Sequence, residues 1–150
     1  MTTGRHLRTL VTWGLAAALA LSTAITALAA GAPAGAGYAT VELSGVVILR
    51  VRDAGGWPSV YARADEVYKR LNEAINAYKD RLTPEMVRIG QVGSAPAIFI
   101  GEHLLVTVDE TSARLNGTTP DKLARIWAAN LKAALSRFVR GQQGPATSDL

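Results

Sequence analysis

The side chains that could carry out acid–base or metal chemistry are few in this sequence. The chain has 150 residues, two histidines and no cysteine. His6 lies within the first ten residues, which leaves His103, beside Glu102, as the one histidine for a folded domain. A metal site needs several ligands. A serine triad would need His103 as its base and a serine in a G-x-S-x-G turn, a pattern that the sequence lacks. We therefore predict no metal site, no cofactor and no catalytic residue, and interpret His103 as a solvated turn residue.

Two adjacent acids, Asp109 and Glu110, resemble the paired carboxylates of glycoside hydrolases. Neighbouring side chains at a helix start point in different directions, and a capping role at the start of a short helix accounts for Asp109. A carboxylate-dependent hydrolase that uses Asp109, Glu110 or Glu102 remains an alternative function.

Four arginines and one tryptophan are the candidate binding residues. If the first helix packs beside the first hairpin, some of these guanidinium groups converge into a patch for an anionic polymer or an acidic partner. The other interpretation is a solvated charged face. The tryptophan lies in a Gly-Gly-Trp-Pro loop, where it either anchors a ligand or folds back over the core. The five residues are Arg50, Arg52, Arg63, Arg70 and Trp57.

The first 29 residues have the layout of a secretory signal peptide. Arg5 and Arg8 form a basic head, an uncharged stretch follows from Leu10, and Ala27-Leu-Ala29 provides an A-x-A cleavage signature. The stretch is also about as long as a bilayer is thick, so an uncleaved N-terminal anchor is the alternative. Both interpretations predict an extracytoplasmic domain, either free in the periplasm or medium or tethered to the inner membrane. The absence of cysteine fits a bacterial envelope protein that folds without disulfides.

The rest of the chain divides by composition into three parts. Residues 30–37 form a Gly/Ala spacer, 38–140 a single domain, and 141–150 a polar tail that we predict to be disordered. Two of the sixteen basic residues lie in the leader and all twelve acids follow it, so the formal charge after the leader falls from +4 to +2. That charge is too small to indicate nucleic acid or strong membrane attraction.

The domain begins with a predicted β-hairpin, in which Ser44-Gly45 is a two-residue turn between apolar runs. In its second strand, alternation places Val47, Leu49 and Val51 on one face. A helix with apolar residues at steps of three and four follows from Ser59, its predicted N-cap, to about Asp80. The predicted strands are 39–43, 46–52, 86–91, 95–100 and 103–108.

Two helical segments close the predicted domain. Asp109 caps a short helix that ends at Leu115, and Thr119-Pro120 begins a long one. The apolar stripe of that long helix includes Ile126 and Trp127. The order is β-β-α-β-β-β-α-α, and the short turns require antiparallel pairing. We therefore predict an α+β fold, with a largely antiparallel sheet of about five strands and two amphipathic helices packed on one face.

These residues resemble the periplasmic N-terminal domain of cyanobacterial-type small mechanosensitive-channel proteins and their stand-alone exported relatives. The resemblance covers about Val41 to Leu135. It implies an envelope location and an α+β fold, without catalytic residues. The spanning helices and pore of the channels are absent from this sequence, so channel activity is not implied. The similar motifs are Ser44-Gly45, Arg63-Ala64, Arg70-Leu71, Ile98–Gly101, Leu105–Asp109, Ala113–Gly117 and Leu123–Trp127.

The sequence thus predicts an exported, non-catalytic module that binds a protein partner or ligand in the bacterial cell envelope. One alternative is a regulatory or sensor domain that docks on a membrane protein, and the other is the hydrolase described above. The expected partner is an envelope protein or an anionic polymer, and the membrane is expected to contribute only through the N-terminal segment.

Overall fold

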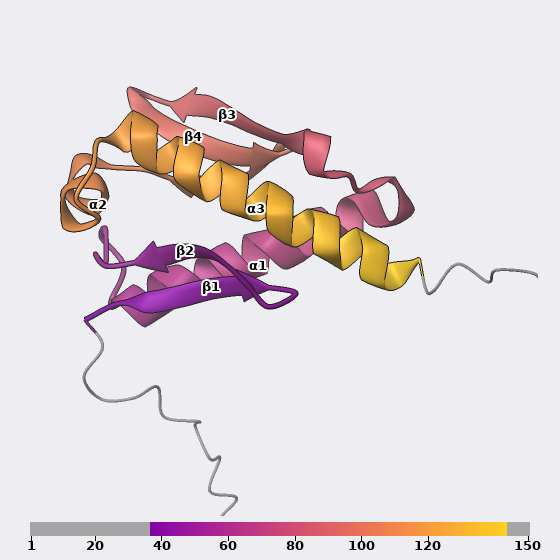
Figure 1. Ribbon diagram of the computed structural model, residues 1–150. Coiled ribbons are helices and arrows are strands. Elements are labelled where there is room, and N and C mark those ends of the chain that lie inside the picture. Colours follow the sequence, from indigo (N-terminus) through magenta and orange to yellow (C-terminus); the bar gives the residue numbers. More distant parts are fainter. Residues whose placement is uncertain (1–36, 144–150) are drawn as a thin grey trace, which may run out of the picture. The chain divides into compact units, whose positions relative to one another are not determined.

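A computed structural model describes residues 37–143 of the chain. The predicted signal peptide, most of the spacer, and residues 144–150 of the predicted tail lie outside the described residues. The domain has mixed helices and antiparallel strands, which confirms the α+β prediction (Figure 1). Its elements are β1 (Ala39–Leu43), β2 (Val46–Val51), α1 (Val60–Tyr78), β3 (Val87–Val92), β4 (Ala95–Ile100), β5 (His103–Thr107), α2 (Glu110–Leu115) and α3 (Pro120–Gln142), with short 3-10 turns at Lys79–Arg81 and Pro84–Met86.

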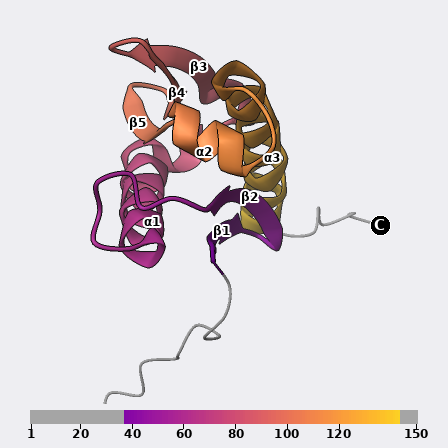
Figure 2. The same ribbon diagram turned by 90° about the vertical axis from the view of Figure 1, so that its left-hand side faces the viewer.

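The five strands divide between two antiparallel sheets instead of forming one. One sheet has the order β1-β2 and the other β3-β4-β5. Both α1 and α3 contact strands of each sheet, so they lie between the sheets and do not share one face of a single sheet. Figure 2 shows this arrangement along the helices, with the two sheets on opposite sides and α1 and α3 closing the gap. The apolar core fills the space that these four layers enclose.

The first hairpin has the predicted turn and an unpredicted bulge. Ser44 and Gly45 have φ values of 51° and 72°, as a type I′ turn requires. The register then shifts, because Val41 pairs with Leu49 while Glu42 pairs with Val47. The extra residue, Ile48, is buried beside Leu49, so strict alternation along this strand is wrong. A similar shift in the second sheet buries Leu105 and Val106 side by side.

Side-chain caps fix the starts of the helices where the sequence predicted them. The Ser59 Oγ accepts a hydrogen bond from the Ala62 N–H at 3.1 Å, and the Thr119 Oγ1 accepts one from the Lys122 N–H at 3.4 Å. The predicted C-terminal boundary is wrong by two residues, because α3 continues past Arg140 to Gln142. No helix within residues 37–143 is long and apolar enough to cross a membrane.

The core combines both helix stripes with the inner faces of both sheets. Its largest fully buried side chains include Ile48, Leu71, Ile98, Leu131 and Leu135. Trp127 is buried, as predicted, with 4% of its surface exposed. Ile126, which the periodicity placed on the same stripe, is 51% exposed because it lies at the border of the stripe beside β2.

Candidate functional site

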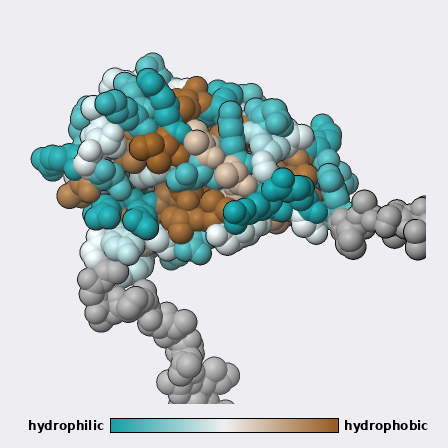
Figure 3. Space-filling model, viewed as in Figure 1, coloured by the Kyte–Doolittle hydropathy of each residue, from teal (hydrophilic) through white to brown (hydrophobic). Residues whose placement is uncertain are grey.

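An open pocket lies between the outer edge of β2 and the first half of α3. Its volume is about 320 Å³. We call it the β2–α3 groove. Figure 3 shows apolar side chains gathered on this face of the molecule, over β2 and α3. The groove is lined by Val47, Ile48, Leu49, Arg50, Asn116, Leu123, Ile126, Trp127 and Asn130.

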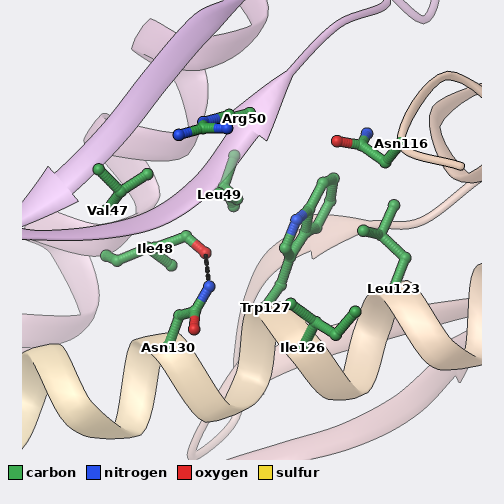
Figure 4. A pocket seen from close by; sticks show the side chains of 9 residues that line it. All are labelled: Val47, Ile48, Leu49, Arg50, Asn116, Leu123, Ile126, Trp127 and Asn130. Carbon is green, nitrogen blue, oxygen red and sulfur yellow. Dashed lines mark hydrogen bonds between the residues drawn. The ribbon is translucent and has the colours of Figure 1, made fainter.

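The bulge in β2 and one turn of α3 build the walls of the groove. The bulge turns both Ile48 and Leu49 inward, so β2 presents two successive apolar residues to the helix. The Trp127 ring stands between α3 and β2, and Asn130 Nδ2 donates a hydrogen bond to the Ile48 carbonyl at 3.1 Å (Figure 4). This bond attaches α3 to the edge of β2 beside the groove.

The charge of the groove is positive. Arg50 is its one ionisable lining residue, and the side chain is exposed. Arg52, two residues along, is also exposed, and both guanidinium groups lie over the ring of Tyr38. The Cζ atoms of Arg50 and Arg52 are 5.7 and 5.2 Å from the centre of that ring. Cation–π contacts of this kind orient a guanidinium without neutralising it. Arg50 therefore keeps its charge at the entrance to an apolar cavity.

Arg63, the third predicted arginine, is buried in the interior of the fold. Only 7% of the residue is exposed, and both terminal nitrogens donate hydrogen bonds. Nη1 contacts the Asp53 carbonyl at 3.1 Å and Ser112 Oγ at 3.1 Å, while Nη2 contacts the Thr107 carbonyl at 3.3 Å and Asp109 Oδ2 at 3.0 Å. We call these five residues the Arg63 cluster. They tie the loop after β2 and the end of β5 to α1 and α2.

The N-terminal turn of α2 holds the Asp109 carboxylate of this cluster in place. Asp109 Oδ1 accepts the Ser112 N–H at 2.6 Å, and Oδ2 accepts the Ser112 hydroxyl at 3.1 Å. Burial raises the pKa of Asp109, but the Ser112 N–H and the positive charge of Arg63 outweigh it, so the pKa lies below its ordinary value. Both oxygens are engaged, and the low pKa keeps the group ionised near neutral pH, where it cannot donate a proton as a general acid.

Arg70 and Trp57 line a small cavity of about 80 Å³ beside Arg63. Arg70 Nε donates to Glu66 Oε1 at 2.8 Å. These two residues lie four positions apart on α1, a spacing that favours such a pair. Trp57 is 40% exposed, so its ring is neither fully in solvent nor fully folded over the core. The five predicted residues therefore fall in two places. Arg50 and Arg52 lie at the end of β2 and just after it, and the other three line the small cavity beside the first half of α1.

His103 and Glu102 lie apart from both places. The His103 ring contacts the Tyr78 ring edge-on at 5.5 Å, and the Tyr78 hydroxyl accepts the Glu102 N–H at 2.9 Å. Glu102 is exposed and lies 3.4 Å from Arg88. These contacts brace a turn. Among residues 37–143, no three His, Cys, Asp or Glu side chains are grouped so that they could hold a metal ion.

A second hollow has the opposite charge. It measures about 400 Å³ and lies beside the starts of α2 and α3. Three carboxylates line it, those of Asp109, Glu110 and Asp121, and no cation does. The two hollows thus favour ligands of opposite sign, which makes the sign of a bound ligand diagnostic of where it binds.

Sequence reasoning found Arg50 and missed the rest of the groove. Asn130 could have been identified from the sequence. It is a polar residue within the buried stripe of α3, three positions after Trp127 and four before Ala134. A polar residue at such a position usually has a specific hydrogen-bond partner. The register shift that turns Ile48 inward has no sequence signature of its own.

Comparison with known proteins gives one match. Residues 40–138 match the family model described as a domain of unknown function, DUF8459. A search of curated proteins and a search of solved structures each find no match.

Proposed function

This chain belongs to the DUF8459 family of domains of unknown function, and we propose that its domain is a non-catalytic binding module for an acidic segment of a protein partner. The proposed site is the β2–α3 groove. The observation that carries the proposal is the composition of its lining: six apolar residues, two amides, one exposed arginine and no carboxylate.

The apolar part of the lining supports a protein ligand over a simple anion. Ile126 is 51% exposed at the rim, and Leu123 and Trp127 lie against the cavity. Covering apolar surface contributes about 25 cal/mol per Å², a term that an inorganic polyanion does not supply. A peptide with an aliphatic or aromatic side chain beside a carboxylate satisfies both parts of the groove.

The charged part selects the sign of the ligand. Arg50 has no carboxylate among its neighbours in the groove, and Arg52 adds a second positive charge just after the end of β2. An arginine binds a carboxylate with two parallel hydrogen bonds, so it fixes direction as well as charge. Aspartate or glutamate next to the apolar anchor is therefore the preferred ligand chemistry.

The location in the proposal comes from the sequence. The predicted leader and the resemblance to periplasmic domains of mechanosensitive-channel proteins support a partner in the bacterial envelope. The regulatory alternative is the case in which that partner is a membrane protein, and it uses the same groove. The hydrolase alternative has less support, because Asp109 is held by Ser112 and Arg63 and because Glu102 lies at an exposed turn.

The direct test is a titration of the isotopically labelled chain with synthetic peptides, followed by NMR. One peptide carries a leucine flanked by glutamates, and its control carries lysines in their place. The acidic peptide should shift the amide signals of Val47, Arg50 and Asn130. The lysine peptide should leave those signals unchanged and move those of the acidic hollow around Glu110, if it binds at all.

A pair of charge reversals then tests the role of Arg50. Arg50→Glu should weaken the acidic peptide about tenfold or more, which corresponds to 1.4 kcal/mol. Arg137→Glu is the matched control, because Arg137 is an exposed arginine of α3 that does not line the groove. Equal weakening by both variants, or shifts confined to residues outside the groove, would contradict the proposal.

A further inference from the structure

We propose that the outer edge of β3 is a self-association surface, at which β3 pairs antiparallel with β3 of a second copy of this chain. The surface consists of the outward backbone groups of Ile89 and Gln91, together with the exposed side chains of Ile89 and Val92. It belongs to the sheet that lacks β2, so the inference does not depend on the β2–α3 groove.

The direction of the backbone groups follows from the pairing of β3 with β4. Gln91 lies opposite Pro96, which has no N–H, and the Pro96 carbonyl accepts the Val108 N–H at 2.8 Å on its other side. This pair is therefore not joined by hydrogen bonds, and antiparallel alternation gives the same result at Ile89 and Val87. The Gly101 N–H donates to the Met86 carbonyl at 2.9 Å, so the next pair along the strands is hydrogen-bonded, as this alternation requires. Ile89 and Gln91 thus direct their N–H and C=O groups away from β4 and are exposed. The Val87 N–H also points away from β4, but it donates to the Pro84 carbonyl, and the residue is buried.

The edge that carries these groups is regular and apolar. The register between β3 and β4 runs from Val87 to Val92 without a bulge. Ile89 is 45% exposed and Val92 is 44% exposed. The one charged residue of the strand, Arg88, is drawn back over its own sheet. Its Cζ lies 4.5 Å from the centre of the Phe99 ring, and its Nε donates to the Gly101 carbonyl at 2.9 Å.

Within residues 37–143, the other strand edges are each blunted or covered. On β1, the Glu42 N–H donates to the Tyr68 hydroxyl of α1 at 2.8 Å. On β2, the bulge breaks the edge and Asn130 occupies the Ile48 carbonyl. The edge strand β5 carries a register shift that breaks its regular pairing. Proteins block open edges in these ways to prevent unwanted pairing. A regular and apolar edge without these blocks is suited to pairing with a strand of another molecule.

The occupant we infer is a second copy because the edge is complementary to itself. A two-fold axis at Ile89 makes Ile89 and its symmetry mate a hydrogen-bonded pair. Val87 then lies opposite Gln91 on both sides, and its carbonyl is the group that faces the Gln91 N–H, because its own N–H donates to Pro84. Arg88 then lies opposite Gly90, so the two arginines do not face each other, and the glycine leaves room for the longer side chain. Such a two-fold contact closes on itself. The product is a continuous antiparallel sheet of six strands.

Hydrogen exchange and sedimentation of the full chain test this pairing together. At high concentration the chain should sediment with about twice its mass of 15.8 kDa. The amides of Ile89 and Gln91 should then be protected from exchange, and they should lose that protection on dilution. The amides of Arg88 and Gly90, which face β4, are the internal control and should stay protected at every concentration.

Two lysine substitutions separate this edge from other contacts. Ile89→Lys places two positive charges opposite each other, so it should sediment as a monomer where the wild type is a dimer. Leu115→Lys changes an equally exposed aliphatic residue at the end of α2 and should remain a dimer. A wild-type monomer at every concentration would overturn the inference. So would protection of Ile89 that does not change on dilution, because another segment of the same chain would then cover the edge. If Ile89→Lys fails to fold, the exchange of the wild-type amides decides the question.

Discussion

The Arg63 cluster and the β2–α3 groove use the same side chain for opposite purposes. Arg63 is buried, and its terminal nitrogens meet two carbonyls, a hydroxyl and the carboxylates of Asp53 and Asp109. Arg50 is exposed, and the described contacts of its guanidinium are with the face of an aromatic ring. A buried charge must be satisfied where it lies, whereas an exposed one is available to a partner. The difference separates an arginine that holds the fold from one that can bind.

The largest expected effect is the loss of Arg63. Arg63→Met should lower the free energy of unfolding by about 2–4 kcal/mol, because it removes the positive charge beside Asp109 and the donor to the Asp53 and Thr107 carbonyls. The cost stays below that of a fully buried pair, since the Asp109 side chain is 40% exposed. Arg50→Met should change stability by less than about 0.5 kcal/mol. Urea denaturation of both variants measures the contrast, and similar losses would remove the distinction between the two regions.

An intermediate effect is expected where the loop packs on the cluster. At Gly55, an added Cβ would lie 2.6 Å from Arg63 Nη1, and the φ angle is +55°. At Gly56 the φ angle is +86°, but nothing lies within 4 Å of an added Cβ. Both alanine variants bear backbone strain of about 1–3 kcal/mol, and Gly55→Ala adds a steric clash. Thermal unfolding should therefore rank Gly55→Ala as the less stable of the two.

The smallest expected effect concerns pH. Because the pKa of Asp109 is depressed in the folded chain, its ionised form contributes stability above the unfolded pKa of about 4. That contribution is lost as the pH falls through the lower, folded value. The stability of the wild type should therefore fall more steeply in acid than that of Asp109→Asn. Denaturant midpoints measured between neutral pH and about pH 2 compare the two slopes. Parallel slopes would show that the carboxylate is not held as described.

Local signals in the sequence were sufficient to predict most of the fold. Ser59, Asp109 and Thr119 are N-caps as predicted, and Ser44-Gly45 forms the predicted turn, because capping and turn formation depend on a few neighbouring residues. The division into two sheets was not predictable in this way, since it depends on how α1 and α3 pack between hairpins distant in sequence. The last residues of α3 were missed because the polar composition of residues 141–150 indicated a tail, whereas the helix continues to Gln142.

The site depended on contacts that span the chain. Arg63 meets Asp109 across 46 positions, and Asn130 meets Ile48 across 82. The predicted set of arginines could therefore contain both a buried residue that holds the fold and an exposed one, without a way to tell them apart. The type of each residue was informative, while its surroundings were set by tertiary packing.

The division of the strands also affects how the fold can vary. Within the described residues, no ladder of strand hydrogen bonds joins the sheet of β1 and β2 to the sheet of β3, β4 and β5. Side chains of α1 and α3 are the main material between them, and buried side chains tolerate exchanges of similar volume. Sequence drift in those helices can thus tilt or separate the halves of the domain, and carry each half's outer surface with it, while every backbone pairing stays intact.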